Sequence, residues 1–146
     1  MASTVKSRKA KARRLQNLLA RELLNIAIDL TYDDVKPAVM GDHGSDIKLS
    51  RAAKVMFPYS FECKNREQLN IWDAIKQAQE NAQIEGLKPV LVFHRNRLKE
   101  PWVAIQLELF LDLMEAVLNA GAHDIRRSSR QLGSSPLAHV CGSDLE

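Results

Sequence analysis

The 146-residue sequence predicts an α/β fold, in which a mixed central sheet carries helices on both faces. Long stretches with apolar residues at helical spacing stand before, between and after a set of short strand-like segments. One of those segments, 89–94, is apolar almost throughout, as expected of a strand buried on both faces. A turn rich in charged residues then returns the chain as the partner strand of a hairpin.

The first helix is expected over residues 12–30. Residues 1–11 before it are basic and nearly devoid of large apolar groups, so they are expected to form a disordered arm. The core stripe of the helix consists of apolar residues at helical spacing, namely Leu15, Leu18, Leu19, Leu23, Ile26, Ala27 and Leu30.

Two short strands are expected next. The first, 32–40, is interrupted by Pro37, which makes it an edge strand or a broken one. After a glycine-rich turn, residues 46–49 alternate polar and apolar side chains. This alternation places Asp46 and Lys48 on one face of the second strand.

A third strand is expected over residues 59–64, after a short helical turn that Ser50 caps and Pro58 ends. Successive side chains of a strand point to opposite faces. Glu62 and Lys64 therefore share one face, and the apolar residues between and before them face a core.

The second helix is expected over residues 67–85, with Asn65 as its cap and Gly86 as its stop. Gln77 and Asn81 lie four residues apart on a stripe beside its apolar face, where a solvated amide pair is one interpretation. The apolar face itself comprises Leu69, Trp72, Ile75, Ala78 and Ala82.

The hairpin pairs the strand 89–94 with residues 102–105, and a third helix is expected over 107–118. From residue 126 a Ser-, Arg- and Gly-rich tail is expected to be flexible. The chain is thus interpreted as one domain over 12–125, between the arm and the tail.

Composition excludes several classes of protein. Apolar content of 45% and charged content of 27% are ordinary for a globular domain. No apolar run approaches the roughly 20 residues that span a bilayer, so a cytoplasmic protein without a membrane segment is expected. Cys63 and Cys141 are too few for a disulfide framework, and the histidines show no zinc-ligand spacing.

Positive charge is concentrated near the N-terminus, ahead of the first acidic residue, Glu22. Such a cluster favours nucleic acid as the partner, because basic groups that contact phosphates release condensed counterions; a solubilising tail is the alternative. The candidate DNA contacts are Lys9, Lys11, Arg13, Arg14 and Arg21, with Arg95 and Arg97 at the hairpin turn, where they could equally be ordinary turn charges.

Asp46 and Glu62 are the candidate metal ligands. Mg²⁺ prefers hard oxygen ligands and is commonly held by one or two carboxylates, water and substrate phosphate. The backbone carbonyl of Cys63 could complete the site, and Lys64 would orient or deprotonate the attacking water. A solvated charge pair at a strand end is the alternative, since an acid two residues before a lysine also occurs at Asp34.

Four segments together resemble a phage-type member of the PD-(D/E)XK nuclease superfamily, and within it the archaeal-type Holliday-junction resolvases. They read Gly44-Ser45-Asp46-Ile47-Lys48-Leu49, Phe57-Pro58-Tyr59-Ser60-Phe61-Glu62-Cys63-Lys64-Asn65, Leu69-Asn70-Ile71-Trp72 and Gln77-Ala78-Gln79-Glu80-Asn81-Ala82. The resemblance covers about residues 13–118. It implies a restriction-endonuclease-like core and a bacteriophage protein that acts in the infected host cell.

The resemblance assigns roles to single residues. The metal-binding acids of the family match Asp46 and Glu62, and its lysine matches Lys64. Gln77 is implied to assist near the metal or the scissile phosphate. The glutamate of the family's first helix falls on Gln16, which could reach a metal only through a bound water and brings no charge, so a second metal site is not expected.

The function predicted from these observations is Mg²⁺- or Mn²⁺-dependent endonucleolytic cleavage of branched DNA, as in DNA recombination. A homodimer is expected, because resolving a junction needs two incisions related by a two-fold axis, and residues 107–118 offer an apolar surface for it. Two alternatives remain: a DNA-binding module with a degenerate nuclease fold, and a nickase acting on DNA without branches.

Overall fold

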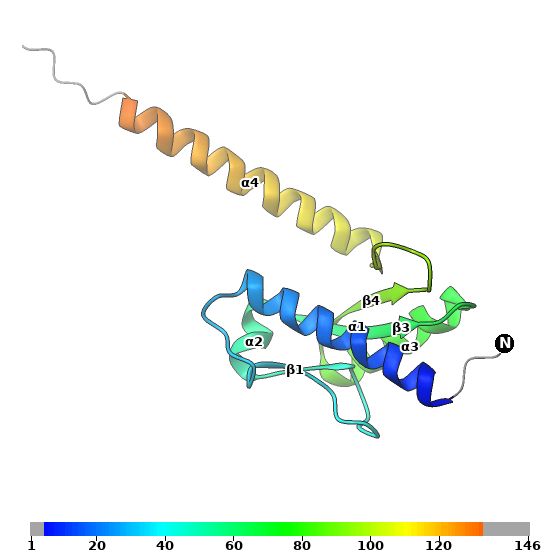
Figure 1. Cartoon of the computed structure of the whole chain (residues 1–146). Helices are drawn as coiled ribbons and strands as arrows, with labels where there is room; N and C mark the ends of the chain where they lie inside the picture. The colour runs from blue at the N-terminus through cyan, green and yellow to red at the C-terminus, as the bar shows by residue number, and fades with distance from the viewer. Residues whose placement is uncertain (1–4, 133–146) are drawn as a thin grey trace, which may run out of the picture. The chain divides into compact units, whose positions relative to one another are not determined.

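The computed structural model describes the backbone of residues 5–132 and the side chains of residues 5–121. The chain divides into two compact units, Met1–Gln106 and Leu107–Glu146, which are described separately. In chain order the elements are α1 (Val5–Ile26), β1 (Val35–Pro37), β2 (Ile47–Leu49), α2 (Arg51–Met56), β3 (Tyr59–Asn65), α3 (Ile71–Glu85), β4 (Lys88–His94), β5 (Trp102–Ala104) and α4 (Leu107–Leu132) (Figure 1).

A three-stranded mixed sheet, in the order β3-β4-β5, forms the centre of the first unit. β3 and β4 run parallel, whereas β4 and β5 are the antiparallel arms of the expected hairpin. β1 and β2 pair separately as a small antiparallel ribbon. The predictions of an α/β fold and a mixed sheet flanked by helices are confirmed.

Helices α1 and α3 contact opposite faces of β3. On one face, the Asn65 side-chain amide donates to the Lys11 carbonyl of α1 over 3.2 Å. On the other, Glu62 and Lys64 bond to side chains of α3. Because neighbouring residues of a strand point in opposite directions, these contacts place the two helices on either side of the strand.

The core beneath α3 is built on small helical residues. Ala74 and Ala78 are buried against Leu91 of β4, and larger apolar side chains surround them. The prediction that Trp72 belongs to this face is wrong, because its side chain is 76% exposed. The buried stripe comprises Ala74, Ala78 and Ala82, whose small side chains let the helix approach the sheet closely.

Backbone hydrogen bonds connect the ribbon to the central sheet at Asp46. Its carbonyl accepts from the Ala38 N–H at 2.8 Å, and its N–H donates to the Phe61 carbonyl at 2.8 Å. The two bonds fix Asp46 between β1 and β3. This is how a residue sixteen positions upstream comes to lie beside Glu62.

The N-terminal segment differs from expectation. Residues 5–11, predicted to be a disordered arm, form the first two turns of α1. Lysine, arginine and alanine are good helix formers, which outweighs the scarcity of apolar groups there. Residues 1–4 lie outside the described part of the chain.

α1 also ends earlier than predicted, at Ile26, because a turn organised by Asp34 follows. Its carboxylate accepts from the N–H and the hydroxyl of Thr31, and also from the Ser50 hydroxyl. Ser50 in turn caps α2 by accepting from the Ala53 N–H, as predicted. The strand expected over 32–40 is correspondingly reduced to the three residues of β1.

α3 begins at Ile71 and not near residue 67. Asn70, not Asn65, is its cap, since the Asn70 side chain accepts from the N–H groups of Trp72 and Asp73. The predicted end at Gly86 is confirmed, and this glycine adopts the left-handed conformation with φ of 66°.

In the second unit, α4 continues well past the expected end at residue 118. Residues 126–132, predicted to start a flexible tail, are helical, since arginine and glutamine favour helices and the single Gly121 does not stop this one. Residues 133–146 lie outside the described part of the chain. Over residues 5–132, no helix is both long and apolar enough to cross a membrane.

Candidate metal centre

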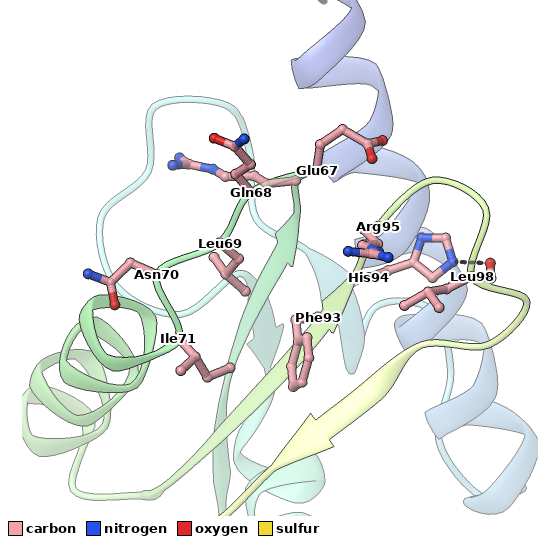
Figure 2. Close-up of a pocket in the computed structure, with 10 residues that line it drawn as sticks. Glu67, Gln68, Leu69, Asn70, Ile71, Phe93, His94, Arg95 and Leu98 are labelled. Carbon is pink, nitrogen blue, oxygen red and sulfur yellow. Dashed lines mark hydrogen bonds between the residues drawn. The ribbon is translucent and has the colours of Figure 1, made fainter.

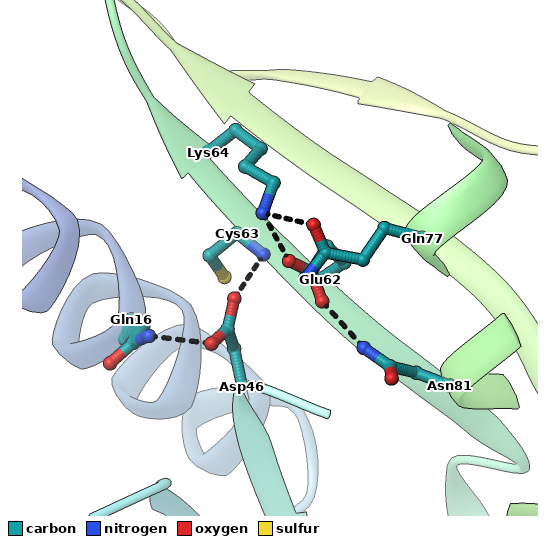
Figure 3. A network of polar contacts seen from close by, with 7 residues as sticks. All are labelled: Gln16, Asp46, Glu62, Cys63, Lys64, Gln77 and Asn81. Carbon is teal, nitrogen blue, oxygen red and sulfur yellow. Dashed lines mark hydrogen bonds and ion pairs between the residues drawn. The ribbon is translucent and has the colours of Figure 1, made fainter. Parts of the chain in front are cut away.

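Side chains from four segments of the chain meet beside β3 (Figure 3). Glu62 and Lys64 come from the strand itself, and Asp46 from the segment that enters β2. Gln16 reaches Asp46 from α1, while two amides of α3 reach Glu62 and Lys64. All the residues named from the sequence as metal or catalytic candidates therefore lie in one cluster.

Both carboxylate oxygens of Asp46 accept hydrogen bonds. Oδ2 accepts from the Cys63 N–H at 2.7 Å, and Oδ1 accepts from Gln16 Nε2 at 2.9 Å. The first of these bonds holds the carboxylate against the backbone of β3. The second bond engages Asp46 with Gln16, a neutral donor that stands at the position where the resemblance implies a glutamate.

Glu62 is held from two sides and is 3% exposed. Lys64 Nζ donates to its Oε1 at 2.5 Å, and Asn81 Nδ2 donates to its Oε2 at 2.9 Å. Lys64 also donates to Gln77 Oε1 at 2.8 Å. Glu62 and Lys64 thus lie on one face of β3, as the alternation predicted. Of the amide pair on α3, Gln77 is exposed and Asn81 partly buried, and both bond to the cluster.

The contact between Asn81 and Glu62 was not singled out from the sequence. The available signal was the spacing of Gln77 and Asn81, because residues four apart on a helix face the same neighbour. The sequence did not show which neighbour Gln77 and Asn81 face, because that depends on how α3 packs on the sheet.

Burial governs the electrostatics of the two acids. Removal from water raises the pKa of Asp46, although the Cys63 N–H and the charge of Lys64 oppose the rise. Burial likewise raises the pKa of Glu62, against the hydrogen bond from Lys64, and the negative charge of Asp46 raises it further. Two carboxylates share one adjacent ammonium, so the ionised cluster retains negative charge that a bound cation would neutralise.

Cys63 presents its backbone to the site and its side chain to the core. Its thiol is buried, and burial raises the thiol pKa far above its usual range, so the thiol is neutral and unreactive. The N–H and C=O of one strand residue point to the same side of the strand. The Cys63 carbonyl is therefore directed toward Asp46, where it could act as a third oxygen ligand.

A second set of contacts fixes the loop that carries Asp46. Glu85, at the end of α3, accepts from the Ser45 N–H at 3.0 Å and lies 2.8 Å from the Ser45 hydroxyl. Gly44 precedes it with φ of +92°, and a Cβ there would come within 3.0 Å of Glu85 Oε1. A side chain at residue 44 would strain the backbone and displace Glu85, so the loop depends on this glycine.

The basic residues predicted to contact DNA occupy several places. Lys9, Lys11 and Arg14 lie on the first turns of α1, where the Lys11 carbonyl contacts the end of β3. Arg95 and Arg97 lie in the turn between β4 and β5. Two guanidinium groups are already engaged: Arg13 donates to the Ala38 carbonyl, and Arg21 pairs with Glu22.

The donor set suits a hard divalent cation held by few protein ligands. Among the described residues, no group of three or more His, Cys, Asp or Glu side chains is placed to bind a metal ion. Asp46 and Glu62 supply two carboxylates, and the Cys63 carbonyl and water could supply the rest. That combination is common for Mg²⁺, which retains several of its waters.

Known protein families, curated proteins and solved structures were compared with the chain, and none of the three comparisons gave a match. The resemblance to nucleases therefore rests on the residues quoted above.

We expect the ionised pair to destabilise the metal-free protein. Both folded-state pKa values lie above the ordinary values of 3.8 and 4.5. At a pH between the unfolded-state pKa and the folded-state pKa of each acid, the folded state holds more protons than the unfolded state. The free energy of unfolding therefore falls as the pH rises through the folded-state pKa. Glu62→Gln should therefore be more stable than wild type near pH 7 in EDTA, and this difference should vanish as the pH falls to about 4.5, as measured by urea unfolding.

The same variants test metal binding without any activity assay. At 100 times its Kd, Mg²⁺ or Mn²⁺ should stabilise the wild-type protein by about 2.7 kcal/mol. Glu62→Gln should lose most of this gain, whereas Glu80→Gln, on the exposed side of α3, should retain it. Equal stabilisation of all three proteins would place the cation elsewhere.

Proposed function

We propose that this protein is a Mg²⁺- or Mn²⁺-dependent endonuclease that hydrolyses phosphodiester bonds in DNA. The observation that carries the proposal is the cluster on β3, where the buried Glu62 and the partly buried Asp46 stand beside a lysine and a glutamine. Surface ion pairs do not usually combine two acids whose pKa values are raised by burial with one shared cation. The basic first turns of α1 support a polyanionic substrate.

Each residue has a distinct role in this proposal. Asp46 and Glu62 would hold the cation, with the Cys63 carbonyl beside them. Lys64 is fixed by Glu62 and Gln77, so its ammonium can orient a water molecule, whereas only its neutral amine form could take the proton of that water. Asn81 keeps Glu62 in place by bonding to its second oxygen. When bound, the metal lowers the pKa of water and neutralises charge on the phosphate.

The preferred substrate in this proposal is branched or otherwise distorted DNA. This part rests on the resemblance to junction-resolving nucleases, together with a basic helix whose Lys11 carbonyl contacts Asn65, the residue after Lys64. The test is product mapping on labelled linear, forked and four-way DNA with and without Mn²⁺. Cleavage confined to the forked and four-way substrates would support structure selectivity. Equal cutting of linear duplex would refute it.

One observation favours a second function, DNA binding without cleavage. Gln16 donates to Asp46 in the place where the related nucleases carry an acid. A neutral amide there removes one negative ligand, which weakens the site for a cation. Conversion of supercoiled plasmid in the presence of Mn²⁺ separates the two functions, and Gln16→Glu should increase cutting if the lost acid limits it.

The basic turns of α1 should contribute a sequence-independent part of DNA binding. Replacing Lys6, Lys9 and Arg14 by alanine keeps a good helix former while removing three charges. The slope of log Kobs against log salt should become shallower by up to about 0.9 per lost phosphate contact. Fluorescence anisotropy across a salt series measures it.

The matched control removes three charges elsewhere, through Lys36→Ala, Lys54→Ala and Lys76→Ala. If both triple variants shift the slope equally, α1 has no special part in binding. If neither shifts it, the contacts lie on other surfaces.

A further inference from the structure

A hollow of about 560 Å³ opens at the carboxyl ends of β3 and β4 (Figure 2). Its apolar part is formed by Leu69, Ile71, Phe93 and Leu98, and Arg66 and Arg95 stand among its polar residues. Ligand sites commonly have this size and pair an apolar wall with a few polar groups. The carboxyl ends of parallel strands are also where α/β proteins usually bind ligands.

The hollow is joined to the candidate metal centre by the register of the sheet. Lys64 of β3 is paired with Phe93 of β4, and Phe93 is paired with Trp102 of β5. Side chains of directly paired residues lie on the same face, and adjacent strands are about 4.8 Å apart. Lys64, Phe93 and Trp102 therefore form one row, which we call the aromatic row, leading away from the cluster.

Trp102 and the arginines are available to a ligand. Trp102 is 61% exposed, so its ring is open to a ligand. Within the described residues, neither Arg66 nor Arg95 uses its guanidinium in an ion pair or hydrogen bond. Phe93 lines the hollow together with these two arginines, and aromatic rings with basic groups are the features that bind single-stranded nucleic acid, through base stacking and phosphate contact.

The wall of the hollow is held in place before any ligand arrives. The Arg66 N–H donates to the His94 carbonyl, and the Asn96 N–H donates to Glu67 Oε1. His94 Nε2 also donates to the Leu98 carbonyl. Glu67, the one acid among the lining residues, is thereby bonded to the turn, and the two arginines outnumber it, so the opening keeps a net positive charge.

The turn itself contains a strained residue. Arg97 has φ of 69°, a left-handed conformation that is unfavourable for a residue with a side chain. A position of this kind persists only when its surroundings enforce it, and such positions gather at binding sites. The contacts of His94 and Glu67 supply that enforcement here.

We propose that the hollow and the aromatic row bind an unpaired DNA strand next to the bond to be cut, with bases stacked on Phe93 and Trp102 and phosphates held by Arg66 and Arg95. This rests on the proposed nuclease function and names its substrate class. Bases in an intact duplex are stacked on each other and cannot reach the rings. The enzyme would therefore need unpaired nucleotides, as at a fork, a flap or the centre of a junction.

The chain contains two tryptophans, so each can be isolated as a reporter. In Trp72→Phe, fluorescence comes from Trp102 alone, and we expect oligothymidylate of about ten nucleotides in EDTA to quench it. A blunt duplex of the same length should leave it nearly unchanged. In Trp102→Phe, the reporter is Trp72 on the outer side of α3, and quenching should be largely lost.

The arginines are tested by charge-matched variants made in Trp72→Phe. Arg66→Ala with Arg95→Ala should weaken oligothymidylate binding on the order of tenfold, because two basic groups that contact phosphate are lost. Arg51→Ala with Lys54→Ala removes two charges from α2 and should change the affinity for oligothymidylate by less than about twofold. Equal losses in both variants, or no quenching of Trp102, would overturn the proposal.

Cleavage assays separate this proposal from the nuclease function itself. With Mn²⁺, forked DNA should be cut faster than duplex, and the Arg66→Ala, Arg95→Ala variant should lose that preference. If wild type and variant cut fork and duplex alike, the nuclease function stands and the unpaired-strand site fails. If nothing is cut but oligothymidylate still quenches Trp102, the strand site stands and the nuclease function fails.

Discussion

Glu62→Gln and Lys64→Ala are each expected to lower DNA cleavage on the order of 10²–10³-fold or more, because each removes a group that the proposed function places at the reacting phosphate. DNA affinity should stay within a few-fold of wild type, since phosphate contacts elsewhere dominate binding. Asp46→Asn should behave in the same way. Rates are measured on labelled forked DNA with Mn²⁺, and affinities by anisotropy in EDTA.

The matched controls are Glu80→Gln and Lys76→Ala. These residues form an exposed pair 4.0 Å apart on α3, so they carry the same charges away from the cluster. Both controls should cut at the wild-type rate. Wild-type cutting by Glu62→Gln or Lys64→Ala would show that another part of the molecule does the chemistry.

The second large effect concerns assembly. We expect the chain to sediment as a homodimer, at twice the 16.5 kDa of one chain. α4 carries an apolar stripe at helical spacing, and a single helix cannot bury its own stripe. Two-fold dimers are the commonest closed assembly, and paired incisions need two centres. The stripe in the part of α4 with described side chains comprises Leu107, Phe110, Leu111, Met114, Val117 and Leu118.

Phe110→Asp with Met114→Asp should shift the sedimenting mass to that of one chain. It should also change symmetric cuts on four-way DNA into single nicks. The matched control, Ala116→Asp with Asn119→Asp, adds the same two charges to the opposite side of α4 and should leave the dimer intact. A wild-type mass near 16.5 kDa would refute the dimer and leave a structure-selective nickase.

Local patterns in the sequence were sufficient for the secondary structure around the candidate site. The alternation over residues 59–64 placed Glu62 and Lys64 on one face because side chains in any strand alternate. Ser50 and Gly86 marked helix ends because capping depends on a few adjacent residues. The hairpin of β4 and β5 followed from two strand-like runs joined by a short charged turn.

Other features depended on contacts between distant residues. Asp46 lies beside Glu62 because its N–H bonds to the Phe61 carbonyl, and Asn81 reaches Glu62 because α3 rests on the sheet through Ala74 and Ala78. The sequence analysis assigned Trp72 to the buried face of α3, although its side chain is exposed, because periodicity does not say how closely a helix approaches its sheet.

The aromatic row shows the same division between sequence and tertiary structure. Lys64, Phe93 and Trp102 are far apart along the chain, and no spacing relates them. Their alignment follows from the register in which β3, β4 and β5 pair. The sequence alone therefore determined the residue types, the strand alternation and those helix ends that a local cap or stop residue marks, whereas strand register and helix docking decided which of those residues became neighbours.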